Sequence, residues 1–342
     1  MRPIEIIGGG LAGLSLGLAL RRADVPVTLH EAGRYPRHRV CGEFIAGLDA
    51  TTSDKLGLAP FLADSSIRRE VVWIRHDKVI NRHTLPEPAF ALSRHTLDKR
   101  LAEAFEAQGG DLRTGSRMDP LPAPPGRVFA HGRHAKARSP WLGLKCHARG
   151  LDLTAHLEVH LGQHAYVGLC LLPDGWVNIT GLFRRRPGLA LDRASALPAY
   201  LHATGLHSLA ERLAAAETDP ESCCAVAGLA FGSSPPSASA KRLVLGDAHA
   251  LIPPFTGNGM AMAFQSAELA LDPLLAWSRD VSVPWSETVA RIQKSLHARF
   301  RLRLVASSAL HPAILQPRGQ AGLALAARTH LLPTTPLYHA LH

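Results

Sequence analysis

Near the start of the chain, the pattern of hydrophobic and polar positions changes from a short apolar run to helical spacing and back to an apolar run. Residues 3–7 form a short apolar run that ends in glycine, which predicts a buried parallel strand. Residues 10–22 carry leucines and small residues at helical spacing, and residues 25–30 form a second apolar run before Glu31. Strand, helix and strand in this order predict a β-α-β unit.

Further along the chain, helical and alternating segments follow one another. Residues 94–108 predict an amphipathic helix, and residues 71–75 and 90–92 have strand-like composition. Residues 151–161 alternate between apolar and polar side chains, which predicts a strand. Two further apolar segments flank Pro173-Asp174-Gly175 and predict a hairpin. Residues 258–274 are helical again, and from Trp285 onward we expect helices with breaks at Pro312, Pro317 and Pro333.

This element order predicts an α/β fold. We expect a Rossmann-like nucleotide-binding domain, an inserted antiparallel β-sheet domain that binds substrate, and a helical C-terminal region. The first is expected to comprise residues 1–45, 93–148 and 238–276. The inserted domain is expected to comprise residues 46–92 and 149–237, and the helical region residues 277–342.

Composition limits the class of protein. Of 342 residues, 46% are hydrophobic and 19% are charged, which is typical of a folded globular chain. The five cysteines form no CxxC pair, which argues against a disulfide framework and against a cysteine zinc site. No apolar run is long enough to span a membrane and no signal-peptide pattern is present, so we expect a cytoplasmic protein.

The net charge of +10 is unevenly distributed. Residues 288–342 contain seven lysines and arginines and no carboxylate. We favour a set of helices with a basic, solvated face. Contact with a membrane surface or with an acidic carrier protein is the alternative. No nucleic-acid-binding motif accompanies the charge.

A glycine pattern follows the first predicted strand. Gly8, Gly10 and Gly13 have the spacing that allows a tight turn and lets backbone N–H groups approach a pyrophosphate. Glu31 ends the next strand, at the distance where an acid accepts a hydrogen bond from a ribose hydroxyl. We therefore predict a dinucleotide site.

A second segment near residue 250 specifies which dinucleotide. Gly246 and Asp247 follow an apolar strand, and Asp247 is placed to hydrogen-bond the polyol chain of a flavin. The chain then continues through Pro254, Gly257, Asn258 and Gly259 into a helix whose N-terminus would face the flavin ring. Together the two segments predict bound FAD.

The motifs resemble those of the para-hydroxybenzoate hydroxylase superfamily, which includes aromatic monooxygenases and geranylgeranyl reductases. The matching pieces are the glycine loop with Glu31, the loop of residues 36–43, residues 93–98, and residues 246–263. The resemblance implies FAD near Arg94 and a loop containing Cys41 that approaches the flavin. Arg34, Arg37 and Arg39 surround this loop, and we expect at least one of them, with Arg39 the candidate, to neutralise the pyrophosphate.

The chain departs from the superfamily pattern at one position. His131 stands where an Asp-Gly pair linked with FAD and NADPH is usual, so NADPH or NADH is only a possible electron donor. The tryptophan motif of halogenases is absent, which argues against halogenation.

Several other residues have alternative interpretations. Cys41 is either a packing residue or a residue of the flavin pocket, and His249 is a candidate acid or base for which a structural role is favoured. His156, Glu158 and His160 share one face of the predicted strand, for which we favour a solvated or cavity-lining face and no metal.

The function predicted from sequence is that of an FAD-dependent oxidoreductase of secondary metabolism. The favoured reaction is monooxygenation, in which reduced flavin forms a hydroperoxide with O₂ and oxygenates an apolar aromatic or polyketide-like molecule. The alternatives are a geranylgeranyl reductase-like enzyme that saturates isoprenoid double bonds, and a non-catalytic flavin-binding or carrier-partner protein.

Overall fold

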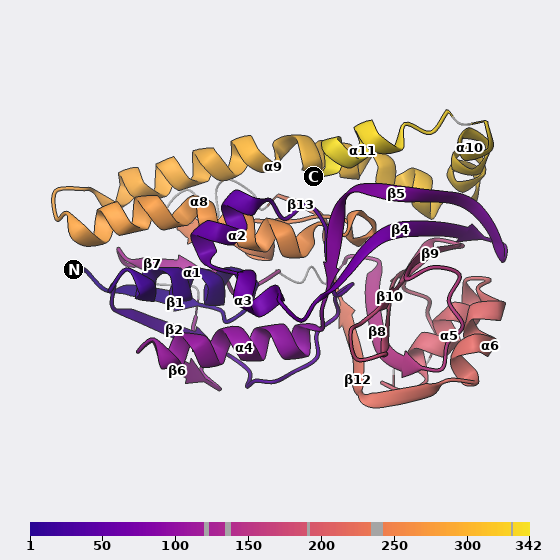
Figure 1. Ribbon diagram of the computed structural model, residues 1–342, viewed down its shortest axis with the longest axis horizontal. Coiled ribbons are helices and arrows are strands. Elements are labelled where there is room, and N and C mark those ends of the chain that lie inside the picture. Colours follow the sequence, from indigo (N-terminus) through magenta and orange to yellow (C-terminus); the bar gives the residue numbers. More distant parts are fainter. Residues whose placement is uncertain (120–122, 134–137, 190–191, 234–241, 330) are drawn as a thin grey trace.

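The computed structural model describes residues 1–119, 123–133, 138–189, 192–233, 242–329 and 331–342. Two sheets stand next to one another, and the C-terminal helices run along the same side of both (Figure 1). This arrangement is the expected α/β fold, in which a nucleotide-binding part and a second sheet share one molecule.

The smaller sheet is parallel and has the order β14-β7-β1-β2-β6. Its strands are β1 (Ile4–Ile7), β2 (Val27–Glu31), β6 (Asp111–Thr114), β7 (Arg127–Phe129) and β14 (Leu243–Val244). Only β7 separates β1 from β14, although more than two hundred residues lie between these two strands in the chain. The sheet therefore places the two predicted nucleotide-binding segments at the same edge.

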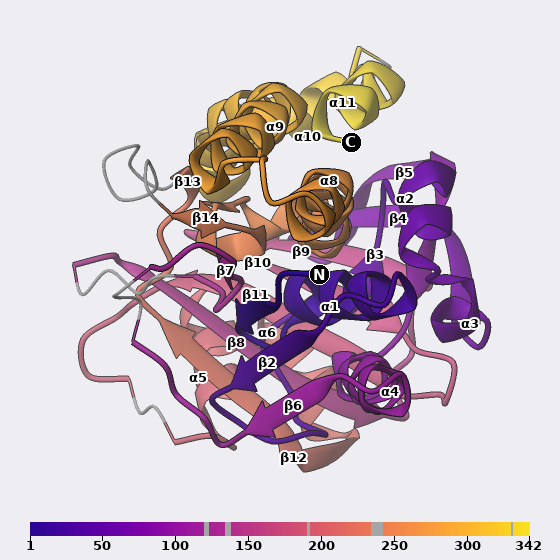
Figure 2. The same ribbon diagram turned by 90° about the vertical axis from the view of Figure 1, so that its left-hand side faces the viewer.

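Helices α1 (Leu11–Arg22), α4 (Arg94–Ala107) and α8 (Gly259–Arg279) pack together beside this sheet. Helix α1 is buried from Leu11 to Leu20 because α4 and α8 both lie against it. A Cβ at Gly17 would lie 3.0 Å from the Phe105 ring, so glycine allows α1 and α4 to approach closely. Figure 2 shows α1, α8 and α9 (Trp285–Leu315) stacked in that order.

The larger sheet has eight strands in the order β12-β8-β11-β10-β9-β4-β5-β3. All its pairs are antiparallel except β4 with β9, which run parallel. Its strands are β3 (Phe44–Ile45), β4 (Ser66–Arg75), β5 (Lys78–Ala91), β8 (Trp141–Arg149), β9 (Leu157–Gly162), β10 (Ala165–Leu171), β11 (Val177–Arg184) and β12 (Glu217–Ala227). The hairpin predicted around Pro173-Asp174-Gly175 is confirmed as β10 and β11.

The strand predicted for residues 151–161 is shorter than expected. Strand β9 begins at Leu157, and residues 151–156 are irregular. The backbone N–H groups of Thr154 and Ala155 donate to the Glu158 carboxylate and not to a neighbouring strand. At these two residues a local side-chain acceptor has therefore replaced the backbone hydrogen bonds to a neighbouring strand that the alternating pattern predicted.

The extent of the larger sheet differs from the predicted domain boundary at residue 148. Strand β8 pairs over its whole length with β11 and β12, both in the larger sheet. The chain therefore leaves the nucleotide-binding part before Trp141 and not after it. Apolar alternation in β8 suits either sheet, so the sequence pattern did not distinguish them. The boundary predicted at residues 237 and 238 lies outside the described residues.

The C-terminal region is helical, as predicted, but its first break is displaced. Helix α9 continues through Pro312 to Leu315, and α10 (Pro317–Arg328) begins at the next proline. Pro317 occupies the first position of α10, where a missing N–H costs nothing. Helix α11 (Thr334–Leu341) follows Pro333. Among the described residues, no helix has the length and apolar character needed to cross a membrane.

The remaining short elements lie around the two sheets. Helices α5 and α6 contribute to the core on one face of the larger sheet, while α2 packs against α1 and α8. These elements are α2 (Ala50–Leu56), α3 (Ala59–Leu62), α5 (Ala196–Ala203), α6 (His207–Ala214), β13 (Gly232–Ser233) and β15 (Ala250–Leu251), with 3₁₀ turns η1 (Gly246–Ala248) and η2 (Pro254–Thr256).

Candidate cofactor and substrate site

A cavity of about 1250 Å³ lies where the predicted motifs meet. Its wall is formed by both glycine segments, the end of β2, the loop of residues 36–44, the start of α4 and residues 130–133. The structure thus brings together segments that the sequence separates by most of its length. The volume is sufficient for a dinucleotide cofactor.

The glycines of the first loop have different structural roles, since two of them allow close backbone packing and one lines the cavity. A Cβ at Gly8 (φ +115°) would lie 2.3 Å from the Ala130 carbonyl oxygen, and one at Gly13 would lie 2.0 Å from the Gly8 carbonyl oxygen. These two glycines are required for packing. Nothing lies within 4 Å of a Cβ at Gly10, which lines the cavity. Gly10 is therefore where a ligand can approach the backbone, and a side chain there would fill that space.

Glu31 lines the cavity at the end of β2, but its carboxylate is already held by the protein. Its oxygens accept hydrogen bonds from Gly9 N (2.9 Å) and Gly33 N (2.8 Å), and Arg37 donates at 2.6 Å. Burial opposes ionisation, but Arg39, Arg37 and the two backbone donors together lower the pKa of Glu31. The ionised carboxylate expected at this position is present, and its neighbouring donors hold it in place.

Arg39 and Arg94 line the same cavity and share one buried acid. Asp98, which is fully buried, accepts a hydrogen bond from Arg39 Nε at 3.0 Å. It also accepts from Nε and Nη2 of Arg94 at 2.7 and 2.8 Å. The bidentate pair fixes the Arg94 guanidinium. Both cations predicted to lie near the cofactor are therefore placed by Asp98 on the first turns of α4.

The cavity wall carries more positive than negative side chains. Arg133 Nε is buried and has no hydrogen-bond partner among the described residues. His131, at the position of the usual acid, also lines the cavity. The arginines of the wall are Arg37, Arg39, Arg94, Arg117, Arg133 and Arg193, and the acids are Glu31, Glu221 and Asp247. An excess of guanidinium groups suits a diphosphate.

The second glycine segment forms the opposite part of the wall. Gly246 and Asp247 lie in η1, and Pro254, Gly257 and Gly259 line the cavity before α8. The side chain of Asp247 is open to this cavity. Burial within it raises the pKa of Asp247, although Arg94 and Arg133 act in the opposite direction.

Asn258, predicted to bind the cofactor, has a different role in the structure. It is completely buried, and its amide donates to the Leu341 carbonyl at the end of α11. It is not among the residues that line the cavity. The sequence pattern identified the loop correctly, but only the fold shows that this side chain turns toward the C-terminus.

A second, apolar cavity of about 280 Å³ adjoins the first. Cys41, Gly42 and Phe44 line both cavities, and so do Asp247 and Pro254. The remaining wall is mainly aliphatic and aromatic, with Trp73, Leu85, Leu157, Tyr166, Leu169, Phe231, Phe255, Ile314, Leu323 and Leu337 among its residues. This cavity fits an apolar ligand held against the edge of the larger one.

The Cys41–Gly42 segment at the junction is fixed by the larger sheet. The Cys41 carbonyl accepts from Asn178 Nδ2 at 3.0 Å and from Thr180 Oγ1 at 2.7 Å, both on β11. Burial raises the pKa of the Cys41 thiol, with Arg94 acting against it. A thiol of this kind stays protonated at neutral pH, which suits packing or contact and not nucleophilic attack.

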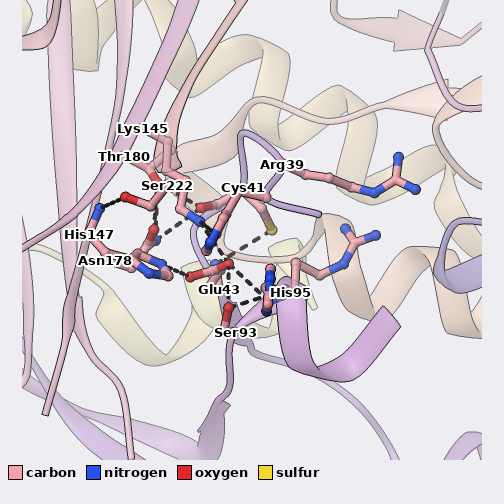
Figure 3. A network of polar contacts seen from close by, with 12 residues as sticks. Arg39, Cys41, Glu43, Ser93, His95, Lys145, His147, Asn178, Thr180 and Ser222 are labelled. Atoms are coloured by element: carbon pink, nitrogen blue, oxygen red, sulfur yellow. Dashed lines mark hydrogen bonds and ion pairs between the residues drawn. The ribbon is translucent and has the colours of Figure 1, made fainter. Parts of the chain in front are cut away.

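A buried ionic network lies directly behind this junction (Figure 3). The Glu43 carboxylate, which has no exposed surface, accepts from Lys145 Nζ and contacts His147 Nε2 at 3.0 and 2.6 Å. Ser93 Oγ and Arg94 N also donate to it. Although burial opposes ionisation, His147 and Lys145 hold the pKa of Glu43 at about 2.

The network reaches the cavity through two histidines. His38 Nδ1 lies 3.2 Å from Lys145 Nζ, and His38 stacks on His95 with ring centroids 4.5 Å apart. Both histidines line the large cavity. Burial, followed by the charge of Lys145, lowers the pKa of His38 to about 4. A neutral imidazole at the cavity wall is thus connected to a charged lysine and carboxylate behind it.

His38, His147 and Asp219 lie close enough together to be considered as metal ligands. The hydrogen-bond pattern argues against that use. Because the Lys145 ammonium can only donate, His38 Nδ1 must accept, and the proton of the neutral ring then lies on Nε2. That nitrogen faces Asp219 at 3.9 Å, and His147 Nε2 is already engaged with Glu43 at 2.6 Å.

Two other histidine predictions have definite outcomes. His249 lies outside the lining of both cavities and faces Phe300 of α9, which supports the structural role. Glu158 and His160 are buried and contact one another at 2.7 Å, so their face of β9 is not solvated. Glu158 lines the apolar cavity, which is the cavity-lining form of the favoured interpretation.

Sequence reasoning missed Lys145, His147, His38 and His95 as site residues. Lys145 and His147 alternate with Leu144 and Cys146 on a strand, which suggests one polar face exposed to water. A lysine and a histidine in an otherwise apolar strand were the available signal. Only the pairing of β8 between β11 and β12 shows that this face is enclosed.

Comparison with known proteins gives a distant sequence relative. No protein-family model matches the chain. The menaquinone reductase of Mycobacterium tuberculosis is 25% identical over 337 residues, covering 84% of this chain and 79% of the relative.

Solved structures give a clearer result. PqsL, a probable FAD-dependent monooxygenase from Pseudomonas aeruginosa, superposes with a TM-score of 0.72 at 16% identity, covering 94% of this chain and 99% of its own. CtdE in complex with FAD has a TM-score of 0.73 at 14% identity, covering 100% and 97%. The chain has the fold of these flavoproteins.

The flavoprotein fold confirms the predicted resemblance at the level of architecture. The flavin-dependent brominase Bmp2 shares it as well, with a TM-score of 0.71 at 15% identity, covering 99% of this chain and 98% of its own. The open space at Gly10, the unpaired Arg133 Nε and the arginine-rich wall each fit an FAD molecule. The flavoprotein fold thus accounts for why the motifs converge on one cavity.

Proposed function

We propose that the protein is an FAD-dependent oxidoreductase that oxygenates an apolar aromatic or polyketide-like small molecule. The observation that carries this proposal is the junction of two cavities, one basic and glycine-lined, the other apolar, at Cys41 and Gly42. A cofactor and a substrate held on either side of this junction would meet there. The complex of PqsL with 2-aminobenzoylacetate, an aromatic ligand, is consistent with this substrate class.

The residues of the large cavity divide into two groups. Gly10 and Glu31 would hold the adenosine end, with the arginines beside them on the diphosphate. Asp247 and the N-terminus of α8 at Gly259 would hold the flavin end. When bound, FAD supplies electron transfer and the activation of O₂.

The protein's own contribution is positioning and exclusion of water. Thr180 and Asn178 fix the Cys41 carbonyl and therefore the junction itself. The apolar wall of the smaller cavity keeps water from the reacting atoms, which protects a reactive oxygen donor from decay. His38 lies at the cavity wall beside Lys145 and so connects the wall to the buried network.

The proposal is tested by the absorption spectrum of the purified protein and its response to electron donors. We expect a flavin spectrum, bleaching by NADPH or NADH, and O₂ consumption that increases with an apolar aromatic substrate. A protein that takes up no FAD from solution would overturn the proposal.

Reduction of an apolar substrate is a second candidate, favoured by the relative named menaquinone reductase. It requires the same two cavities and differs in its use of oxygen. Product formed under strict anaerobiosis with a chemically reduced flavin would support reduction, whereas a strict O₂ requirement supports monooxygenation. The cytoplasmic location remains a prediction from the sequence.

A further inference from the structure

The C-terminal segment forms one wall of the apolar cavity. The second half of α9, α10, the link after it and α11 all contribute aliphatic side chains to the lining. These residues are Leu310, Ile314, Leu323, Leu332, Leu337 and Leu341. In this region the wall of the cavity is therefore built from the C-terminal helices and the link between them.

The outer face of the same segment is apolar as well. Leu302, Val305, Leu325 and Leu331 are 64%, 63%, 62% and 76% exposed. They make up half of the eight large hydrophobic residues that are exposed in the described part of the chain, yet they fall within thirty residues. A helix that is apolar on its inner and outer sides needs a second apolar environment outside.

Exposed basic side chains occur in the same segment as these residues. Along α9 steps of three or four residues link the exposed positions 291, 294 and 298, then 298 with both 301 and 302, and 302 with 305, so these positions form one stripe. The stripe changes from basic to apolar toward α10. We define the C-terminal docking surface as the four apolar residues above together with Arg291, Lys294, Arg301, Arg318 and Arg328.

Two nearby cations do not belong to this surface. Arg299 pairs with Asp49 at 2.7 Å, and Arg303 is buried against Gln265. The five arginines and lysines that remain are exposed, and no carboxylate occurs from residue 288 to the end of the chain. The surface therefore attracts an anionic partner with no acidic group of its own segment to offset it.

We propose that the C-terminal docking surface binds an anionic lipid bilayer, from which an apolar substrate enters the smaller cavity. A bilayer can bind both kinds of residue on this surface. Its anionic headgroups would attract the cations, and its acyl chains would contact Leu302, Val305, Leu325 and Leu331. A second copy of the chain would bring an equally basic face and repel this one. The route for substrate rests on the proposed function, whereas the docking itself does not.

Flotation of the full-length protein with lipid vesicles tests the proposal. We expect binding to vesicles of equal parts phosphatidylglycerol and phosphatidylcholine, weak binding to phosphatidylcholine alone, and release at high salt. Replacing both Leu302 and Val305 with Glu should lower binding at least about tenfold, because it removes apolar contacts and adds two negative charges. The matched control is Val281→Glu together with Ile67→Glu, which changes two exposed apolar residues outside the surface.

Three results would overturn docking on lipid. These are no binding to anionic vesicles, equal loss in the control double variant, and self-association that the Leu302 and Val305 variant abolishes without any vesicle binding. The measurement requires neither FAD nor turnover. Vesicle binding by a protein that takes up no FAD would therefore support docking while contradicting the proposed function.

Discussion

Glu43 keeps a full charge at a position closed to solvent, and it does so in the left-handed region of backbone space (φ 55°). Both features are costly for a non-glycine residue. They are compensated by Lys145, His147 and two donors at the start of α4, so that the network joins β8 of the larger sheet to α4 behind the cavity junction. We expect this residue to be important for both stability and the geometry of Cys41.

Replacing Glu43 with Gln should lower the free energy of unfolding by about 3–5 kcal/mol, because it leaves a buried lysine without its counter-charge. Chemical denaturation measures this directly. The matched control is Glu70→Gln, which removes one partner of an exposed pair with Arg82 and should cost no more than about 1 kcal/mol. Equal losses in the two variants would contradict the account of the network.

The lowered pKa of the same carboxylate predicts how the free energy of unfolding changes at acidic pH. Its pKa in the folded protein is about 2, below the ordinary 4.5, so its ionised form favours folding. That contribution is complete above pH 4.5 and is lost as pH falls from 4.5 toward 2. Wild type should therefore lose more stability than Glu43→Gln over this range. Parallel curves of unfolding free energy against pH would refute the assignment.

The glycine loop offers a pair of variants that separate folding from ligand binding. Gly10→Ala adds a methyl group into open cavity space. We therefore expect a free energy of unfolding within about 1 kcal/mol of that of the wild type, and a loss of FAD affinity. Gly13→Ala places a methyl group 2.0 Å from the Gly8 carbonyl oxygen and should destabilise the fold itself. Thermal melts with and without FAD distinguish the two effects. A stable Gly10→Ala protein with full FAD affinity would contradict the assigned approach path.

At the scale of whole elements, the stability of helix α1 depends on its close packing against α4 and α8. Phe105 of α4 is fully buried and fills the space that Gly17 and Gly110 leave open. Replacement of Phe105 with Ala should cost about 3–5 kcal/mol, because the cavity created cannot close between two fixed helices. The exposed neighbour Glu106 provides a control, since Glu106→Ala should change stability by about 0.5 kcal/mol or less. Denaturant unfolding of both variants checks the difference.

Apolar runs, helical spacing and turn residues were sufficient to predict the first β-α-β unit, the hairpin at Pro173-Asp174-Gly175 and the longer helices, because these signals are local in the chain. They were insufficient where a side chain competes with the backbone, as Glu158 does for residues 154 and 155. They also did not assign β8 to a sheet or show that Lys145 and His147 are enclosed, because enclosure is decided by strands distant in the chain. The glycine and acid motifs located the cofactor cavity, whereas the ionic network behind it required the fold.

At the scale of the whole molecule, the wall of the large cavity combines residues from Ile7 to Ala263 and strands of both sheets. A ligand bound there would add contacts between these segments to the hydrogen bonds that already join some of them. Binding to the folded state alone raises the free energy of unfolding by about 2.7 kcal/mol when free ligand is at a hundred times its dissociation constant. FAD should therefore stabilise the molecule as one unit, and not only the parallel sheet.

The most direct test of the central claim is uptake of FAD by the full-length protein, followed by gel filtration and a thermal melt. The account predicts that about one flavin comigrates with each chain and raises the melting temperature, and that Gly10→Ala loses both effects while remaining folded. Absence of retained flavin, with identical melting of wild type and Gly10→Ala in the presence of FAD, would contradict it.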